Sequence, residues 1–140
     1  MIKTVFAGLL LAAAVTATAQ DLPRTPAPEG ASVYIISPRD GDVVASPVTV
    51  RFGLKGMGVA PAGVEAQGTG HHHLLIDAEV PNSGLPIPAD DNHRHFGKGQ
   101  TEATIELAPG QHTLQLLLGD HLHIPHAPPV VSERITITVE

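Results

Sequence analysis

Short stretches in which apolar side chains alternate with other residues constrain the fold of this chain most strongly. Residues 48–54, 72–77, 112–118 and 134–139 all alternate in this way. A period of two is typical of strands with one buried face, and we find no helical period to compete with it. Residues 33–36, 43 and 101–107 add further strand-forming stretches. Turn signals such as Pro109-Gly110 separate them.

This pattern predicts an all-β fold, an antiparallel β-sandwich of the immunoglobulin-like or fibronectin type. The chain has 140 residues without tryptophan or cysteine, so an antibody-type domain is not expected. The glycines and prolines leave a small barrel or a cupin-like double-stranded fold as alternatives. The size suits one domain, which we place at residues 32–140.

The first residues have the pattern of an export signal. Lys3 precedes an apolar run at 5–15, and Ala17-Thr18-Ala19 resembles a cleavage site, which predicts a signal peptide at residues 1–19. The alternative is an N-terminal membrane anchor. Residues 20–31 are proline-rich and predict a tether. We therefore expect a periplasmic or secreted protein with no transmembrane segment after cleavage.

The charge balance narrows the classes of partner. The formal net charge is −6, and removal of Lys3 with the leader would make it about −7. Phosphate backbones and anionic lipids attract basic surfaces, so neither nucleic acid nor an anionic membrane is an expected partner. The protein partner stays unknown.

Histidine is the residue type that most strongly indicates a function. The chain has nine histidines, and eight of them form three clusters, at 71–73, 93–95 and 121–126. Each cluster contains a His-x-His step, and side chains two apart on an extended segment point the same way. Each step can therefore offer two imidazoles to one metal ion.

The predicted topology brings these clusters to one end of the sandwich. The strand at 71–77 should lie antiparallel to the strand at 112–118, which places the first cluster beside the third. The second cluster should lie in a long polar loop, 81–100, that ends at the same pole. Met57 belongs to a glycine-rich loop there, whereas His112 should lie at the opposite pole.

The predicted metal ligands are the histidines of these clusters together with one methionine: His71, His73, His93, His95, His121, His123, His126 and Met57. His72 is in phase with Leu74, so it can be either a core residue or a ligand. Solvated loop residues are the alternative reading for the second cluster. Asp90, Asp91 and Asp120 could orient an imidazole or cap a turn.

Several longer phrases resemble one known family. They stand at 36–38, 56–63, 70–77, 92–101 and 117–126, and include Gly70-His71-His72-His73 and Asn92-His93-Arg94-His95. They are similar to those of the bacterial exported proteins called domain of unknown function 4399. The resemblance implies a bacterial envelope protein and implies no activity.

Together these observations predict an exported metal-binding protein. Because the chain has no thiolates, its imidazoles favour copper first and zinc second. We expect the protein to act in storage, delivery or tolerance of the metal. One alternative is a non-metal envelope interaction or adhesion module whose histidines form a hydrogen-bonded cluster. Another is a metal-dependent, superoxide-dismutase-like enzyme, although the chain lacks the disulfide usual there. A histidine-brace oxidase is not expected, since the predicted mature chain begins at Gln20.

Overall fold

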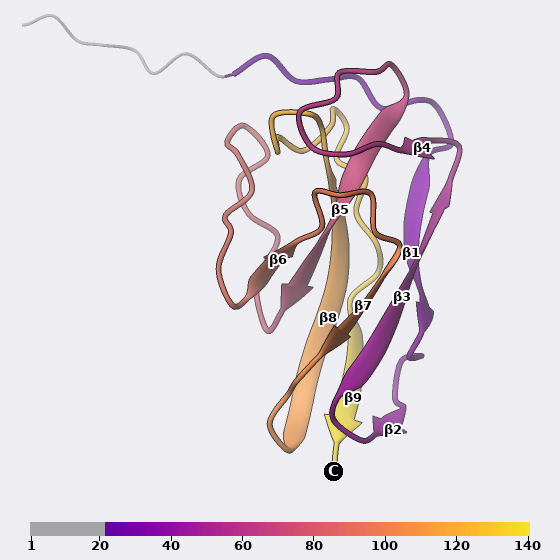
Figure 1. The fold of residues 1–140 in the computed structure, drawn as a ribbon, viewed down its shortest axis with the longest axis vertical. Coiled ribbons are helices and arrows are strands. Elements are labelled where there is room, and N and C mark those ends of the chain that lie inside the picture. Colours follow the sequence, from indigo (N-terminus) through magenta and orange to yellow (C-terminus); the bar gives the residue numbers. More distant parts are fainter. Residues whose placement is uncertain (1–21) are drawn as a thin grey trace, which may run out of the picture.

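A computed structural model describes residues 22–140 of the chain, and the predicted signal peptide lies outside this range. The described residues form nine strands and no helix (Figure 1). Accordingly, none of them forms a helix long and apolar enough to cross a membrane. The strands are β1 (Ser32–Ser37), β2 (Val43–Val44), β3 (Val48–Lys55), β4 (Gly58–Val59), β5 (Thr69–Ile76), β6 (His93–His95), β7 (Glu102–Ile105), β8 (Gly110–Gly119) and β9 (Ile135–Val139).

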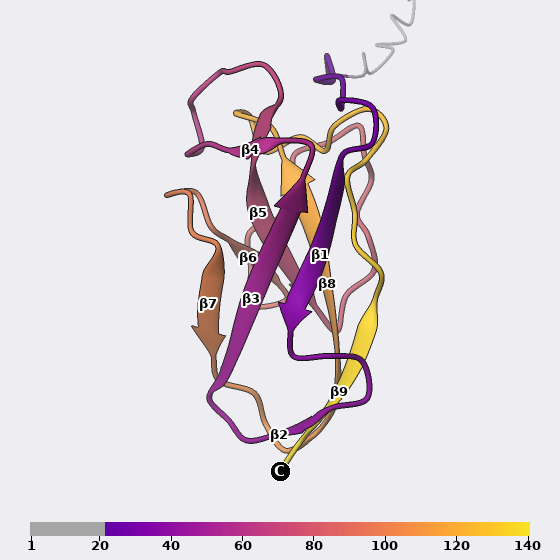
Figure 2. The same cartoon turned by 90° about the vertical axis from the view of Figure 1, so that its right-hand side faces the viewer.

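The strands form two layers, which confirms the predicted β-sandwich. One sheet has the order β1-β3-β7, and the other has the order β2-β9-β8-β5-β4, with β6 also paired to β5. The two layers face each other in Figure 2, where β3 and β1 lie in front of β8. The expected antiparallel pairing of β5 with β8 is present, and β3 also pairs antiparallel with β7.

The structure differs from the sequence prediction between the main strands. The second histidine cluster was expected in a loop, but it forms the short strand β6 at the edge of β5. Carboxylate capping explains where β6 begins, because Asp90 Oδ1 accepts the amides of Asn92 and His93. Residues 77–92 contain no strand. The short pairings β2–β9 and β4–β5 are parallel.

The main core fills the space between the sheets. It takes the alternating apolar residues of β3, β5, β8 and β9, including Val50, Leu74, Leu116 and Ile137, all fully buried. A smaller cluster on the outer face of the six-stranded sheet joins Leu75 and Leu117 to Ile87. The segment 77–92 therefore covers part of that outer face.

The segment before β1, predicted as a tether, lies against the loop that follows β8. Pro26 forms a bridge with Ala127, and the amide of Ala27 donates to the Ala127 carbonyl at 3.0 Å. Both segments lie at the top of the molecule in Figure 1.

We predict a large difference between two leucine truncations. Leu116 is fully buried in the main core, so Leu116→Ala should lower the free energy of unfolding by about 2–5 kcal/mol. Leu85 is 55% exposed, so Leu85→Ala should lower it by about 0.5 kcal/mol or less. Urea unfolding of the two variants provides the measurement. Equal losses would mean that the inner face of β8 has been misassigned.

Candidate metal centre

The first histidine cluster lies on a strand that is buried on both faces. In β5, His72 pairs with Leu118 and His73 with Leu117 across the ladder to β8. Because side chains alternate along a strand, His72 points into the main core, where its ring lies 5.0 Å from that of Phe52. His71 and His73 point to the outer face instead. All three are at most 1% exposed.

Four imidazoles from three separate segments of the sequence meet on that outer face. One ring nitrogen from each of His71, His73, His95 and His123 lies within 4.8 Å of one from every other. His71 Nε2 and His123 Nδ1 share a hydrogen bond of 3.0 Å. Tetrahedral coordination at metal–nitrogen distances of about 2.05 Å separates ligand nitrogens by about 3.4 Å. Small ring movements would therefore let these four side chains hold a metal ion.

Strand β6 supplies His95. In the antiparallel ladder with β5, His95 stands opposite His73, and their ring centroids are 5.1 Å apart. A Cβ built on Gly97 would approach Nε2 of His95 to 2.6 Å, so the ring occupies space that only a glycine leaves free. His95 is the exposed member of the group. The four-histidine cluster therefore has one side open to solvent.

A second glycine makes room for His73. Gly119, at the end of β8, stands opposite His71 in the ladder. A Cβ there would lie 2.7 Å from Cε1 of His73. Any larger residue would push the His73 ring away, which makes Gly119 part of the construction of the site.

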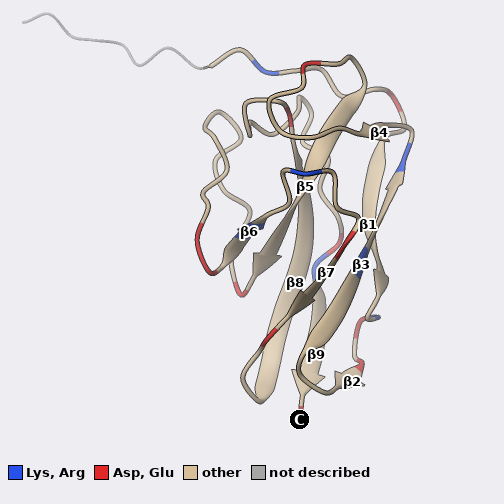
Figure 3. Ribbon diagram, viewed as in Figure 1, with Lys and Arg blue, Asp and Glu red and all other residues tan. Residues whose placement is uncertain are grey.

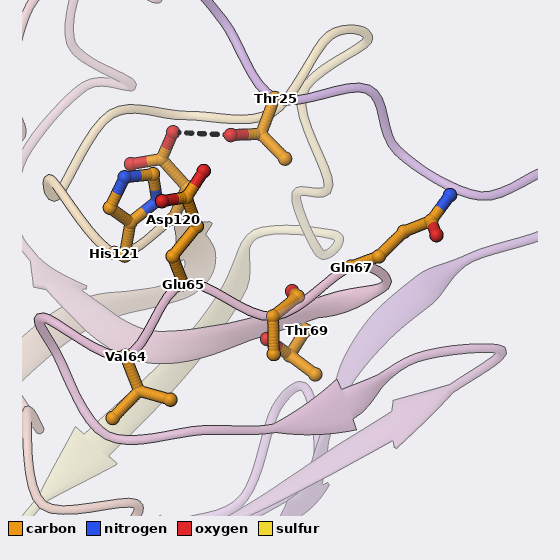
Figure 4. A pocket seen from close by; sticks show the side chains of 8 residues that line it. Thr25, Val64, Glu65, Gln67, Thr69, Asp120 and His121 are labelled. Carbon is orange, nitrogen blue, oxygen red and sulfur yellow. Dashed lines mark hydrogen bonds between the residues drawn. The ribbon is translucent and has the colours of Figure 1, made fainter.

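His123 comes from the tight turn after β8. Its φ is +65°, a left-handed conformation that few residues other than glycine adopt, although histidine is among those enriched there. The buried Asp120 shapes this turn, because its Oδ1 accepts the amides of Leu122 and Ile124. Its Oδ2 accepts the hydroxyl of Thr25 at 2.7 Å (Figure 4). Of the two roles considered for Asp120, orienting an imidazole or capping a turn, its hydrogen bonds therefore support the second.

The buried histidines are poorly satisfied as hydrogen-bonding groups. Within residues 22–140, every buried side-chain nitrogen or oxygen that lacks a hydrogen-bond partner is a histidine ring nitrogen. They are Nδ1 of His71, both nitrogens of His72, Nδ1 of His73 and Nδ1 of His126. A buried polar group without a partner usually destabilises a fold by about 1–3 kcal/mol. So many together are typical of a functional site.

The surroundings keep these imidazoles neutral. Burial, helped by His123 and His95, lowers the pKa of His71 to about 4. Burial also lowers the pKa of His73 to about 2, with contributions from His71 and His95. Burial, followed by the effect of the neighbouring His123, lowers the pKa of His95. Neutral imidazoles have a free lone pair, the form that a metal ion requires.

Asp120 supplies negative charge near the cluster. Neither β5 nor β8 carries Asp, Glu, Lys or Arg, and both ribbons are uncharged along their length in Figure 3. Burial acts to raise the pKa of Asp120, but hydrogen bonds from Thr25 and the turn amides outweigh it and lower the pKa. Asp120 is therefore ionised at neutral pH, where it favours positive charge on His71.

The structure places the other four predicted ligands outside this group. Nδ1 of His93 lies 2.8 Å from Asp90. His126 is fully buried, with Nε2 3.1 Å from the Thr69 carbonyl. Met57 packs against the main core.

His121 is the fourth of these predicted ligands. It lines a pocket of about 200 Å³ together with Glu65 and Asp120, on the N-terminal side of the same turn (Figure 4). In that view its ring lies close to both carboxylates.

Sequence reasoning missed the residues that support the site. Gly97 and Gly119 leave room for two of the rings. Thr25 donates a hydrogen bond to Asp120, whose carboxylate shapes the turn that carries His123. The alternation in β5 is a local signal, and it predicts that His71 and His73 share one face of the strand. No local signal reveals that Thr25 contacts a residue so far along the chain.

A comparison with known families gives the chain its relatives. The family model described as "Domain of unknown function (DUF4399)" matches residues 50–140. The chain belongs to the DUF4399 family. The matched region runs from within β3 to the C-terminus and includes all four clustered histidines of this DUF4399 protein. No curated protein and no solved structure matches the sequence. The function must therefore be argued from the site.

We predict that the metal-free protein loses stability as the pH falls from about 6.5 towards 5. The folded state holds His71, His72 and His73 with pKa values well below 6.5, so in this range the unfolded chain binds protons that the folded chain does not. Each such histidine contributes a slope of up to about 1.4 kcal/mol per pH unit. Urea unfolding at several pH values measures this slope.

His72→Leu provides the control, because it removes one buried imidazole from an apolar environment and should flatten the slope. His112 acts in the opposite sense. Its hydrogen bond to Asp77 raises its pKa, so its contribution is present below 6.5 and is lost as the pH rises through the folded pKa. A slope of zero between pH 6.5 and 5 would contradict burial of the three neutral imidazoles.

Proposed function

We propose that this DUF4399 protein is an exported metal-binding protein whose four-histidine cluster holds one ion. The observation that carries the proposal is the convergence of His71, His73, His95 and His123 within 4.8 Å. Three of these side chains have lowered pKa values and keep their lone pairs at neutral pH.

The unpartnered nitrogens favour a metal site over a purely structural polar cluster. A hydrogen-bonded cluster would pair its ring nitrogens with one another, yet the four rings share a single hydrogen bond, between His71 and His123. Buried nitrogens of His71 and His73 are left without partners. Coordination is the interaction that uses imidazole lone pairs without needing a matching donor.

The donor set argues for copper first and zinc second. All four donors are imidazole nitrogens, and such sites suit Cu(II) and Zn(II), with copper highest in the affinity series of divalent ions. Met57, the predicted soft ligand, is partly buried and packs against the main core, so its sulfur gives no support to Cu(I) binding. With four protein ligands and one exposed edge at His95, the site suits storage, delivery or tolerance of the metal.

Removal of His95 tests this function most directly. His95 is exposed, so His95→Ala should leave folding intact while it removes one ligand. We expect affinity for Cu(II) and Zn(II), measured by calorimetry, to fall by more than the 10–100-fold typical of losing an outer-shell partner. His93→Ala, in the same strand, and His112→Ala, at the other end of the sandwich, are the matched controls and should bind as the wild type does.

The outcomes of this experiment are distinct. Binding of one ion by the wild type and weak binding by His95→Ala would support the four-histidine site. If the wild type binds neither ion below about 100 µM, an envelope interaction module becomes the better explanation, since so weak a site would scarcely fill. If His93→Ala weakens binding as much as His95→Ala does, the ligand set is wrong.

Export is a separate part of the proposal and has its own test. The apolar run after Lys3 and the Ala17-Thr18-Ala19 sequence support cleavage after Ala19. We expect N-terminal sequencing of the protein from its native host to find Gln20 first, in the periplasmic or secreted fraction. Retention of Met1 on a cytoplasmic protein would contradict export without affecting the metal site.

A further inference from the structure

The segment before β1 contacts the loop that carries His123. We call residues 24–27 the N-terminal strap. Its backbone pairs with the loop, since the Ala27 amide donates to the Ala127 carbonyl at 3.0 Å and the Ala127 amide donates to the Thr25 carbonyl at 2.9 Å. The Arg24 guanidinium donates to the carbonyls of Pro125 and His126. Every one of these contacts is with the loop rather than with a sheet.

The strap reaches the metal centre through Asp120. The Thr25 hydroxyl donates to Oδ2 of Asp120 at 2.7 Å, the contact dashed in Figure 4. Asp120 is 2% exposed, and its Oδ1 accepts the amides of Leu122 and Ile124 at 2.9 and 3.0 Å. One side chain therefore connects the strap to the turn.

The turn in question sets the position of His123. The His123 amide donates to the Asp120 carbonyl at 2.9 Å, and His123 has a left-handed φ of +65°. A non-glycine residue stays in that conformation only where its surroundings hold it there. Loss of the Thr25 hydrogen bond would loosen Asp120, then the turn, and with it the ring that lies 3.0 Å from His71.

We propose that the N-terminal strap regulates the metal site: docking of the strap through Thr25 and Asp120 holds His123 among the other three imidazoles, and metal binding in turn stabilises the docked strap. This inference rests on the proposed function, because it requires an ion at the four-histidine cluster. Asp120 acts here as a positioning residue. Release of the strap would leave three histidines at the site and so favour release of the ion.

The fold allows the strap to move on its own. The strap belongs to neither sheet, and its backbone pairing with the loop is limited to the bridge between Pro26 and Ala127. Ala27 alone among its residues packs against the main core. Segments with few buried apolar contacts open locally at low free energy while the rest of the domain stays folded.

Thr25→Val tests one direction of the coupling. The substitution keeps the shape of the side chain and removes the hydroxyl, so we expect calorimetry with Zn(II) and with Cu(II) to show affinity lowered by about fivefold or more at unchanged stoichiometry. The matched control is Thr49→Val, which removes the 3.0 Å hydroxyl contact with Thr104 within the three-stranded sheet and should leave affinity unchanged.

A double-mutant cycle separates an effect through His123 from a general loss of stability. In a His123→Ala background, Thr25→Val should cause no further loss of affinity, because the ring that it positions is absent. Equal losses of affinity in both backgrounds would overturn the proposed route through Asp120 and His123.

Zn(II) binding to the wild type tests the other direction, because coupling between two sites is reciprocal. We expect saturating Zn(II) to slow amide hydrogen exchange at Ala27 and Ala127 by at least the factor by which Thr25→Val weakens binding. The Leu107 amide, which donates to Ser46 Oγ at 3.0 Å near the opposite end of β3, is the control and should not change.

Two failures can be told apart. A wild-type protein that binds neither Zn(II) nor Cu(II) would overturn the proposed function and the coupling together. A wild type that binds while Thr25→Val binds equally well, or while exchange at Ala27 is unaffected by Zn(II), would overturn the coupling alone.

Discussion

The antiparallel pairing of β5 with β8 is the interaction on which the rest of this structure depends. Its register sets His71 against Gly119 and His72 against Leu118, and so decides which imidazole faces the core and which face the outer side. Neither strand carries a charged residue; β5 is buried along nearly its whole length and β8 over most of its C-terminal half. A slip of one residue would exchange the two faces and disperse the site.

The neutral state of the imidazoles explains how the fold can bury so many histidines. Imidazoles are neutral over most of the pH range once burial has lowered their pKa values, as it does for His71, His72 and His73. The remaining penalty is that of unpartnered ring nitrogens. A metal ion at the outer face would use lone pairs of His71 and His73, whereas His72 and His126 lie outside the four-histidine group.

The site is assembled from segments that the fold holds in different ways. His71 and His73 lie on a central strand, His95 lies on a three-residue edge strand, and His123 lies on a turn with a left-handed residue. The central pair is therefore fixed by the core, while the other two ligands depend on local hydrogen bonds. With an ion bound, such an arrangement would allow release through small movements at the edge, without unfolding of the sandwich.

The sequence by itself determined the class of fold and the face on which the candidate ligands lie. Alternation in residues 48–54 and 112–118 was enough to predict strands, and the phase of Leu74 was enough to separate His72 from His71 and His73, because both follow from the period of two. Tertiary structure alone decided which imidazoles meet. His95 reaches the cluster through the register of β6, a strand that local patterning had assigned to a loop, and His123 through a turn shaped by Asp120. Thr25 supports that turn from a distant part of the sequence, and contacts between distant residues leave no periodic trace in the chain.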